Sequence, residues 1–260
     1  MIVFPTTRAI REYINIQKNK NQFLDKIITI GNLFELAIRD KDNRKLIDKD
    51  LKIIYLKEVI NRVDISSLGL SDNFNSFLKQ SEYIFRFFNE LATEYIELDT
   101  LLEYDTYILY SDHIEVLKYI YKEYVELLEE NGYIDNFMIP NSYVINEEYI
   151  SQYPKIEIHL EGYLSKFEFN IIKDLSKIST IIIKLNLNEY NKKNIKLFDF
   201  IEDELEVNYS YDIDLTNKNI LNKNPIDKIT QDITISNISS KIEQIAFIKY
   251  QITNMINKGI

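Results

Sequence analysis

Apolar and polar positions alternate most clearly between residues 153 and 187. In the first part of this segment, Ile156, Ile158 and Leu160 alternate with polar residues. After Gly162, residues 167–175 show apolar positions at helical spacing, and residues 181–187 form an apolar, largely β-branched run. This order predicts strand, loop, helix and strand. Such a unit is typical of a parallel α/β sheet that presents its loops at the carboxyl edge.

The first 39 residues show the same type of pattern. An apolar run over residues 1–4 ends at Pro5, and Thr6 is a suitable N-cap for the helix that should follow. A second strand candidate covers residues 26–30 and leads into another helix. Residues 1–39 and 153–203 are therefore predicted to form one α/β domain with a parallel-type sheet.

The long middle segment, residues 40–152, has a different pattern. Apolar residues recur at helical spacing over 51–60, 74–91 and 114–128. We expect an α-helical insertion between the two halves of the sheet. Its tyrosine and phenylalanine stripes favour a packed core over base stacking, since stripes at this spacing are usually buried.

The last part of the chain, residues 204–260, is predicted to begin a second lobe. A Tyr-, Asp- and Asn-rich stretch with little periodicity precedes a brief strand candidate at 233–235 and a helix over 239–258, with Gly259 as its C-cap. The chain stops where a further strand would be expected. This pattern indicates a fragment of a longer protein.

Composition excludes several classes of chemistry. The chain has no cysteine, which removes disulfides, thiolate metal sites and iron–sulfur clusters. Its formal net charge of -10 argues against a broad phosphate-binding face, so any contact with DNA should be local.

No stretch approaches the length of a membrane span, and no signal peptide is recognisable at the N-terminus. We expect a cytoplasmic protein without membrane contact.

Familiar catalytic motifs are missing from the sequence. Neither a GxxxxGK[ST] phosphate loop nor a GxGxxG, HExxH or GxSxG motif occurs. The two histidines, His113 and His159, are far apart in the chain and are interpreted as structural residues. We therefore predict no catalytic residue, no metal site and no cofactor.

Two short stretches are candidates for a functional site. Thr6, Thr7 and Arg8 stand at a predicted helix N-terminus, where free backbone N–H groups attract anions; simple capping with a solvated Arg8 is the alternative. Glu161 ends a predicted strand, where a carboxylate can hold magnesium in phosphate-loop ATPases. Because no phosphate loop accompanies it, a structural or vestigial role for Glu161 is favoured.

Four segments together resemble a known family. The segments FPTTRAIREY (4–13), KIITIGNLFELAI (26–38), NSFLKQSEYIFRFFNELATEYIELDTL (75–101) and IEIHLEGYLSKFEFNIIKDL (156–175) resemble the N-terminal half of AddB. AddB is the UvrD-like inactivated-helicase and nuclease subunit of the bacterial AddAB complex. The likeness covers nearly the whole chain and is strongest before residue 187.

The resemblance implies roles for both stretches. Thr6, Thr7 and Arg8 match the family's motif that contacts single-stranded DNA. Glu161, Gly162 and Tyr163, followed by Phe167 and Glu168, take the place of the second ATPase motif, with glutamate instead of aspartate.

The implied function is a helicase-like scaffold in double-strand break repair and recombination. It would bind an AddA-like helicase-nuclease subunit and guide single- or double-stranded DNA, without chemistry of its own. The family's PD-(D/E)XK nuclease domain would lie beyond residue 260. Two alternatives are a protein-interaction module without DNA contact and an ATP-dependent enzyme whose phosphate loop comes from a partner.

Overall fold

The structure is a computed structural model. It describes residues 1–17, 23–63, 68, 74–103, 110–201, 204–226, 237–238 and 240–257. Two compact units are present, Met1–Ile226 and Asp227–Ile260. The strand predicted at 233–235 and the cap predicted at Gly259 lie outside the described residues.

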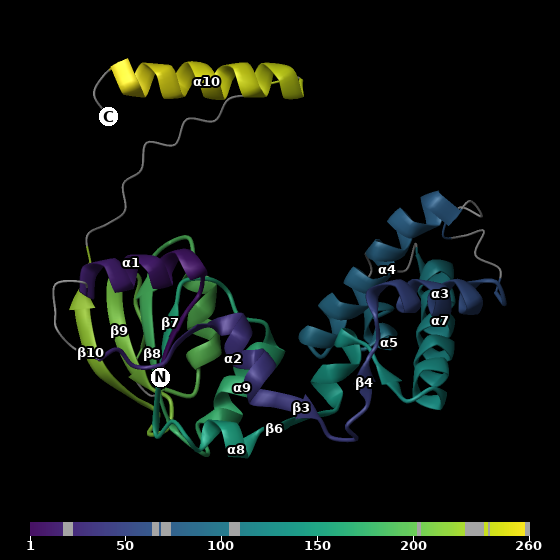
Figure 1. The fold of residues 1–260 in the computed structure, drawn as a ribbon, viewed down its shortest axis with the longest axis horizontal. Helices are drawn as coiled ribbons and strands as arrows, with labels where there is room; N and C mark the ends of the chain where they lie inside the picture. Colours follow the sequence, from purple (N-terminus) through teal and green to yellow (C-terminus); the bar gives the residue numbers. More distant parts are fainter. Residues whose placement is uncertain are drawn as a thin grey trace. The chain divides into compact units, whose positions relative to one another are not determined.

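A six-stranded sheet organises the first unit (Figure 1). Its strands are β1 (Ile2–Phe4), β2 (Ile27–Thr29), β7 (Lys155–Leu160), β8 (Thr180–Leu187), β9 (Tyr209–Asp214) and β10 (Asn219–Pro225). The strand order is β10-β9-β8-β7-β1-β2, and the four strands from β8 to β2 are parallel. The predicted α/β class with a mostly parallel sheet is confirmed, and β1 pairs directly with β7.

The sheet continues past residue 203, the predicted end of the α/β domain. β9 pairs antiparallel with β8, and β10 pairs antiparallel with β9. Tyr211 and Ile213 are buried and alternate with the less buried Ser210 and Asp212. This period of two was missed because polar residues occupy the outward positions and polar residues also flank the strand. Residues 209–225 therefore belong to the first sheet and not to a second lobe.

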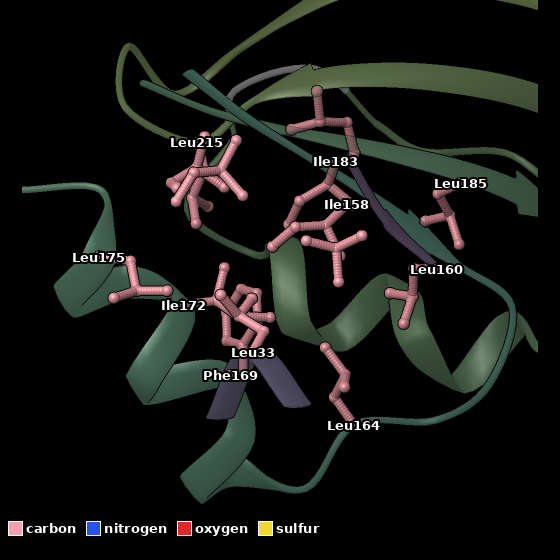
Figure 2. Close-up of a cluster of buried hydrophobic side chains, with 14 of the residues drawn as sticks. Leu33, Ile158, Leu160, Leu164, Phe169, Ile172, Leu175, Ile183, Leu185 and Leu215 are labelled. Atoms are coloured by element: carbon pink, nitrogen blue, oxygen red, sulfur yellow. The ribbon is translucent and has the colours of Figure 1, made fainter. Parts of the chain in front are cut away.

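One face of the sheet carries the main apolar core. Strand residues such as Ile158 and Ile183 pack there with Leu33 of α2 (Ile30–Ala37) and Ile172 of α9 (Lys166–Leu175) (Figure 2). The 3-10 helix η3 (Lys192–Phe198) adds its Phe198. Each such side chain contributes about 1.5–3 kcal/mol by burial. The face is apolar because the inward positions of β7 and β8 are almost all isoleucine or leucine.

Helix α1 (Thr7–Gln17) lies against the other face. The ring of Phe4, at the end of β1, packs 5.1 Å from Tyr13 of α1 and 4.4 Å from His159 of β7. The backbone N–H of Ala9 donates to the hydroxyl of Thr6 at 3.2 Å, so Thr6 caps the helix as predicted.

The chain between β3 (Ile38–Asp40) and β6 (Tyr143–Ile145) forms a helical body with a core of its own. The helices that the structure describes in it include α3 (Lys49–Ile60), α4 (Phe74–Thr93), α5 (Leu98–Leu101), α7 (Ser111–Glu130) and the 3-10 helix η2 (Asn136–Asn141). Two small ribbons link it to the sheet: β3 with β6, and β4 (Lys45–Leu46) with β5 (Tyr133–Ile134). The short helix α8 (Glu147–Ile150) leads back to β7. Phe88, Tyr124 and Phe137 are buried in this core, and the helical spacing of the sequence had predicted the burial of Phe88.

The second unit contains helix α10 (Lys241–Asn257), within the predicted helix 239–258. Its role as the start of a second lobe stays a prediction. In the described ranges of both units, no helix has the length and apolar character needed to cross a membrane.

Candidate functional site

The sheet order changes direction between β1 and β7. From β1 the chain proceeds to β2 on one side, whereas from β7 it proceeds to β8 on the other. In open α/β sheets, ligands bind beyond the carboxyl ends of the strands at such a switch point. This edge of the sheet is the first place to look for a site.

Both stretches singled out in the sequence lie at this edge. Val3 of β1 is paired with Ile158 of β7. Thr6 and Glu161 each lie three residues after these positions, just beyond the ends of the two strands. Thr6, Thr7 and Arg8 are exposed, and so are the three residues from Glu161 to Tyr163. No hydrogen bond or ion pair joins the two stretches in the part of the chain that the structure describes. Their side chains are therefore open to a ligand at the same edge.

The loop after β7 is fastened to η3. The side-chain amide of Asn194 donates from Nδ2 to the carbonyl oxygen of Gly162 at 2.9 Å, and Asn194 is only 1% exposed. A Cβ at Gly162 would meet no atom within 4 Å. The backbone here therefore does not require glycine. Among the described residues, no cluster of three or more His, Asp or Glu side chains is placed to hold a metal ion.

A cavity of about 910 Å³ opens beside this loop, and we call it the lysine pocket. It is lined by Tyr95, Tyr163, Lys166, Phe169, Asn170, Lys173, Lys193, Lys196 and Leu197. Four of these nine side chains are cationic and none is acidic. Of the stretches predicted from sequence, only the one after β7 contributes, through Tyr163.

Helix α9 supplies one wall of the lysine pocket. A capping box fixes its start, because Glu168 N–H donates to Ser165 Oγ at 3.3 Å and Ser165 N–H donates to Glu168 Oε2 at 2.8 Å. Lys166, Asn170 and Lys173 follow at helical spacing and share one face. Glu168, which the resemblance placed in an ATPase-like motif, thus has a capping role.

Helix η3 supplies the opposite wall. The side chains of Asn188 and Asn191 close the turn that leads into it, accepting backbone N–H groups at 2.8 Å. In a 3-10 helix, residues three apart eclipse one another, which aligns Lys193 with Lys196. The walls of the lysine pocket are thus fixed by local hydrogen bonds that need no ligand.

The lysines of the pocket have no ion pair with any carboxylate that the structure describes. This holds for Lys166, Lys173, Lys193 and Lys196 alike. Lys173 lies over the rings of Phe169 and Phe200 (4.7 and 5.3 Å from Nζ to the centroids).

Neighbouring lysines on the same elements are paired. Lys177, just after α9, contacts Asp174 at 2.6 Å, and Lys192 of η3 contacts Glu189 at 3.1 Å. The pocket therefore concentrates positive charge in a chain that is acidic as a whole.

Tyr95 adopts an unusual backbone conformation at the rim. It follows α4 with φ of 53°, a left-handed conformation that favours glycine. Hydrogen bonds from Tyr95 N–H to the Ala92 oxygen and from Ile96 N–H to the Leu91 oxygen form a Schellman motif. A side chain in this conformation costs roughly 1–2 kcal/mol. The protein thus tolerates strain at a residue whose ring lines the lysine pocket.

Tyr163 lies on the same rim and is 58% exposed. Partial burial, and then the nearby Glu94 carboxylate, raise the pKa of its hydroxyl above the ordinary tyrosine value. The hydroxyl of Tyr163 can donate a hydrogen bond to an anion.

A second charged group lies on the α1 face of the sheet, and we call it the polar face. Lys184 of β8 contacts Asp212 of β9 at 3.0 Å and Glu157 of β7 at 4.0 Å. His159 Nε2 lies 3.1 Å from the Glu157 carboxylate. The His159 hydrogen bond, followed by the Lys184 charge, lowers the pKa of Glu157 despite its burial. These charges satisfy one another.

Sequence reasoning missed the lysine pocket. No lysine stands out in the sequence, and no local signal marks Tyr95. The spacing of Lys166 and Lys173, seven residues apart, and of Lys193 and Lys196, three apart, does place each pair on one helix face. What it does not show is that the two faces meet across one cavity.

A scan against models of known protein families gives no match to this sequence, and neither does a comparison with curated proteins. The likeness to AddB therefore stays a hypothesis.

Proposed function

We propose that this chain is a helicase-like scaffold of the AddB type, which guides a single strand of DNA along the carboxyl edge of its sheet. The proposal is supported most by the position of Thr6, Thr7 and Arg8 beside the loop after β7. These two stretches, more than 150 residues apart in the chain, follow the carboxyl ends of the paired strands β1 and β7 at the switch point.

Two sequence features favour a DNA-binding scaffold over a motor. An Arg8 guanidinium and a helix N-terminus suit a phosphodiester. The sequence has no phosphate-loop lysine that could hold a nucleoside triphosphate beside Glu161. In this proposal an AddA-like partner supplies motor and nuclease chemistry for double-strand break repair in the cytoplasm.

Binding of a fluorescent oligo-dT to the 260-residue chain at low salt tests the proposal. Arg8→Glu should weaken binding roughly tenfold, since it replaces an attraction to phosphate by repulsion. Arg11→Glu, one turn further along α1, makes the same charge change farther from the edge and should weaken binding less than Arg8→Glu does. Equal affinities for the wild type and Arg8→Glu would overturn the proposal.

A protein-interaction module without DNA contact is the second candidate, favoured by the net charge of -10. It predicts that oligo-dT does not bind at any salt concentration.

A further inference from the structure

We propose that the lysine pocket is a second contact for the same DNA strand, with its lysines holding phosphates and its two exposed tyrosines stacking on bases. This inference rests on the proposed function for the identity of the ligand. The pocket itself was not among the sites that the sequence indicated.

The charges in the pocket favour a phosphate ligand. Lys177 and Lys192 each lie close to a carboxylate that neutralises part of their charge. The four pocket lysines lack such a partner among the described carboxylates, and all four line one cavity. Placing like charges together costs free energy unless an anion neutralises them. A phosphodiester backbone supplies such an anion at each nucleotide.

The aromatic side chains favour a nucleic acid over a simple anion. Tyr95 and Tyr163 are 39% and 58% exposed at the rim, whereas Phe169 is buried beneath them at 3%. Single-strand binding sites combine a basic groove with aromatic rings on which bases stack. The strained backbone of Tyr95 is consistent with selection for its ring, since glycine would fit that position without strain.

The position of the pocket connects it to the sheet edge. Tyr163 lines the pocket and follows Glu161 and Gly162 directly in the loop after β7. The hydrogen bond from Asn194 to the Gly162 carbonyl joins this loop to the helix that carries Lys193 and Lys196. In this proposal the strand passes from Arg8 along the loop after β7 to the pocket.

Two double variants with the same loss of charge test the inference. Lys173→Gln with Lys196→Gln removes one lysine from each wall. Lys177→Gln with Lys192→Gln removes two lysines from the same region that lie outside the pocket and pair with carboxylates. At about 0.1 M salt the pocket variant should bind oligo-dT roughly tenfold more weakly than wild type, and the control less than twofold more weakly. Equal losses in the two variants would overturn the inference.

Base stacking by the two tyrosines is tested with variants that remove a ring but keep the fold. Tyr163→Ala changes an exposed side chain, and Tyr95→Gly keeps the left-handed backbone. Each should weaken oligo-dT binding about fivefold or more, while Tyr163→Phe should retain most of the affinity. If neither ring removal changes the affinity, base stacking in the pocket is refuted.

A competition experiment separates the possible sources of phosphate. Millimolar inorganic phosphate or thymidine monophosphate should displace oligo-dT only weakly, because each occupies one part of the pocket. Full displacement by either would show a small-molecule site and overturn the inference. If Arg8→Glu weakens binding and the pocket variant does not, only the inference fails. Without any oligo-dT binding, the proposed function fails as well.

Discussion

The lysine pocket and the polar face are built from the same types of charged residue but differ in how the charges are paired. On the polar face, Lys184 lies between the carboxylates of Asp212 and Glu157. In the lysine pocket, Lys193 and Lys196 have no such partner among the described carboxylates. Paired charges hold strands together, whereas converging unpaired charges are available to a ligand. Lysine content alone therefore says little about function.

The two regions also rest on different supports. Strand register fixes the polar face, since Lys184 is directly opposite Asp212 on the neighbouring strand. The lysine pocket is instead built on the apolar core, because Phe169 lies in its lining and also belongs to the main cluster. The pocket should therefore be rigid at its base and adaptable at its rim.

The largest effect is expected from Phe169→Ala. This change removes a side chain that is 3% exposed and should lower the free energy of unfolding by about 3–5 kcal/mol. Tyr163→Ala, at the exposed rim of the same cavity, should change it by about 0.5 kcal/mol or less. Urea unfolding of the 260-residue chain measures both. Similar losses in the two variants would contradict the division into a core-supported base and an open rim.

A smaller effect is expected from acid on the polar face. Hydrogen bonds from Asn222 and Lys184 outweigh burial and lower the pKa of Asp212, and the pKa of Glu157 is also lowered. A carboxyl group whose pKa is lower in the folded state stabilises the protein above its unfolded pKa, near 4. That stability is lost as the pH falls through the folded value.

Lys184→Gln isolates this contribution. The variant should lose about 1 kcal/mol or less at pH 7, because the pairs are partly exposed, and should show a shallower loss of stability in acid. Its affinity for oligo-dT should match that of wild type. Parallel stability–pH curves for the two proteins would show that Lys184 does not stabilise these carboxylates.

Much of the sheet was predictable because local patterns determine it. The alternation of Ile156, Ile158 and Leu160, and the cap at Thr6, each reflect interactions within a few residues. Two sites predicted separately then came together because parallel strands place their carboxyl ends at one edge.

The rest of the site depends on contacts that sequence patterns do not carry. The lysine pocket joins Tyr95, at the end of α4, to α9 and η3, which begin about 70 and 100 residues later. Nothing local marks a tyrosine that adopts the left-handed conformation. The strands β9 and β10 were missed for a related reason, since polar residues occupy their outer face.

The most direct test compares both regions in one measurement. Lysine acetylation of the 260-residue chain, followed by mass spectrometry, reports the accessibility of each ammonium group with and without oligo-dT. The account predicts strong protection of Lys193 and Lys196 by the oligonucleotide, and unchanged labelling of Lys192 and of Lys184. Protection of Lys184 or Lys192 with no protection of the pocket lysines would contradict it.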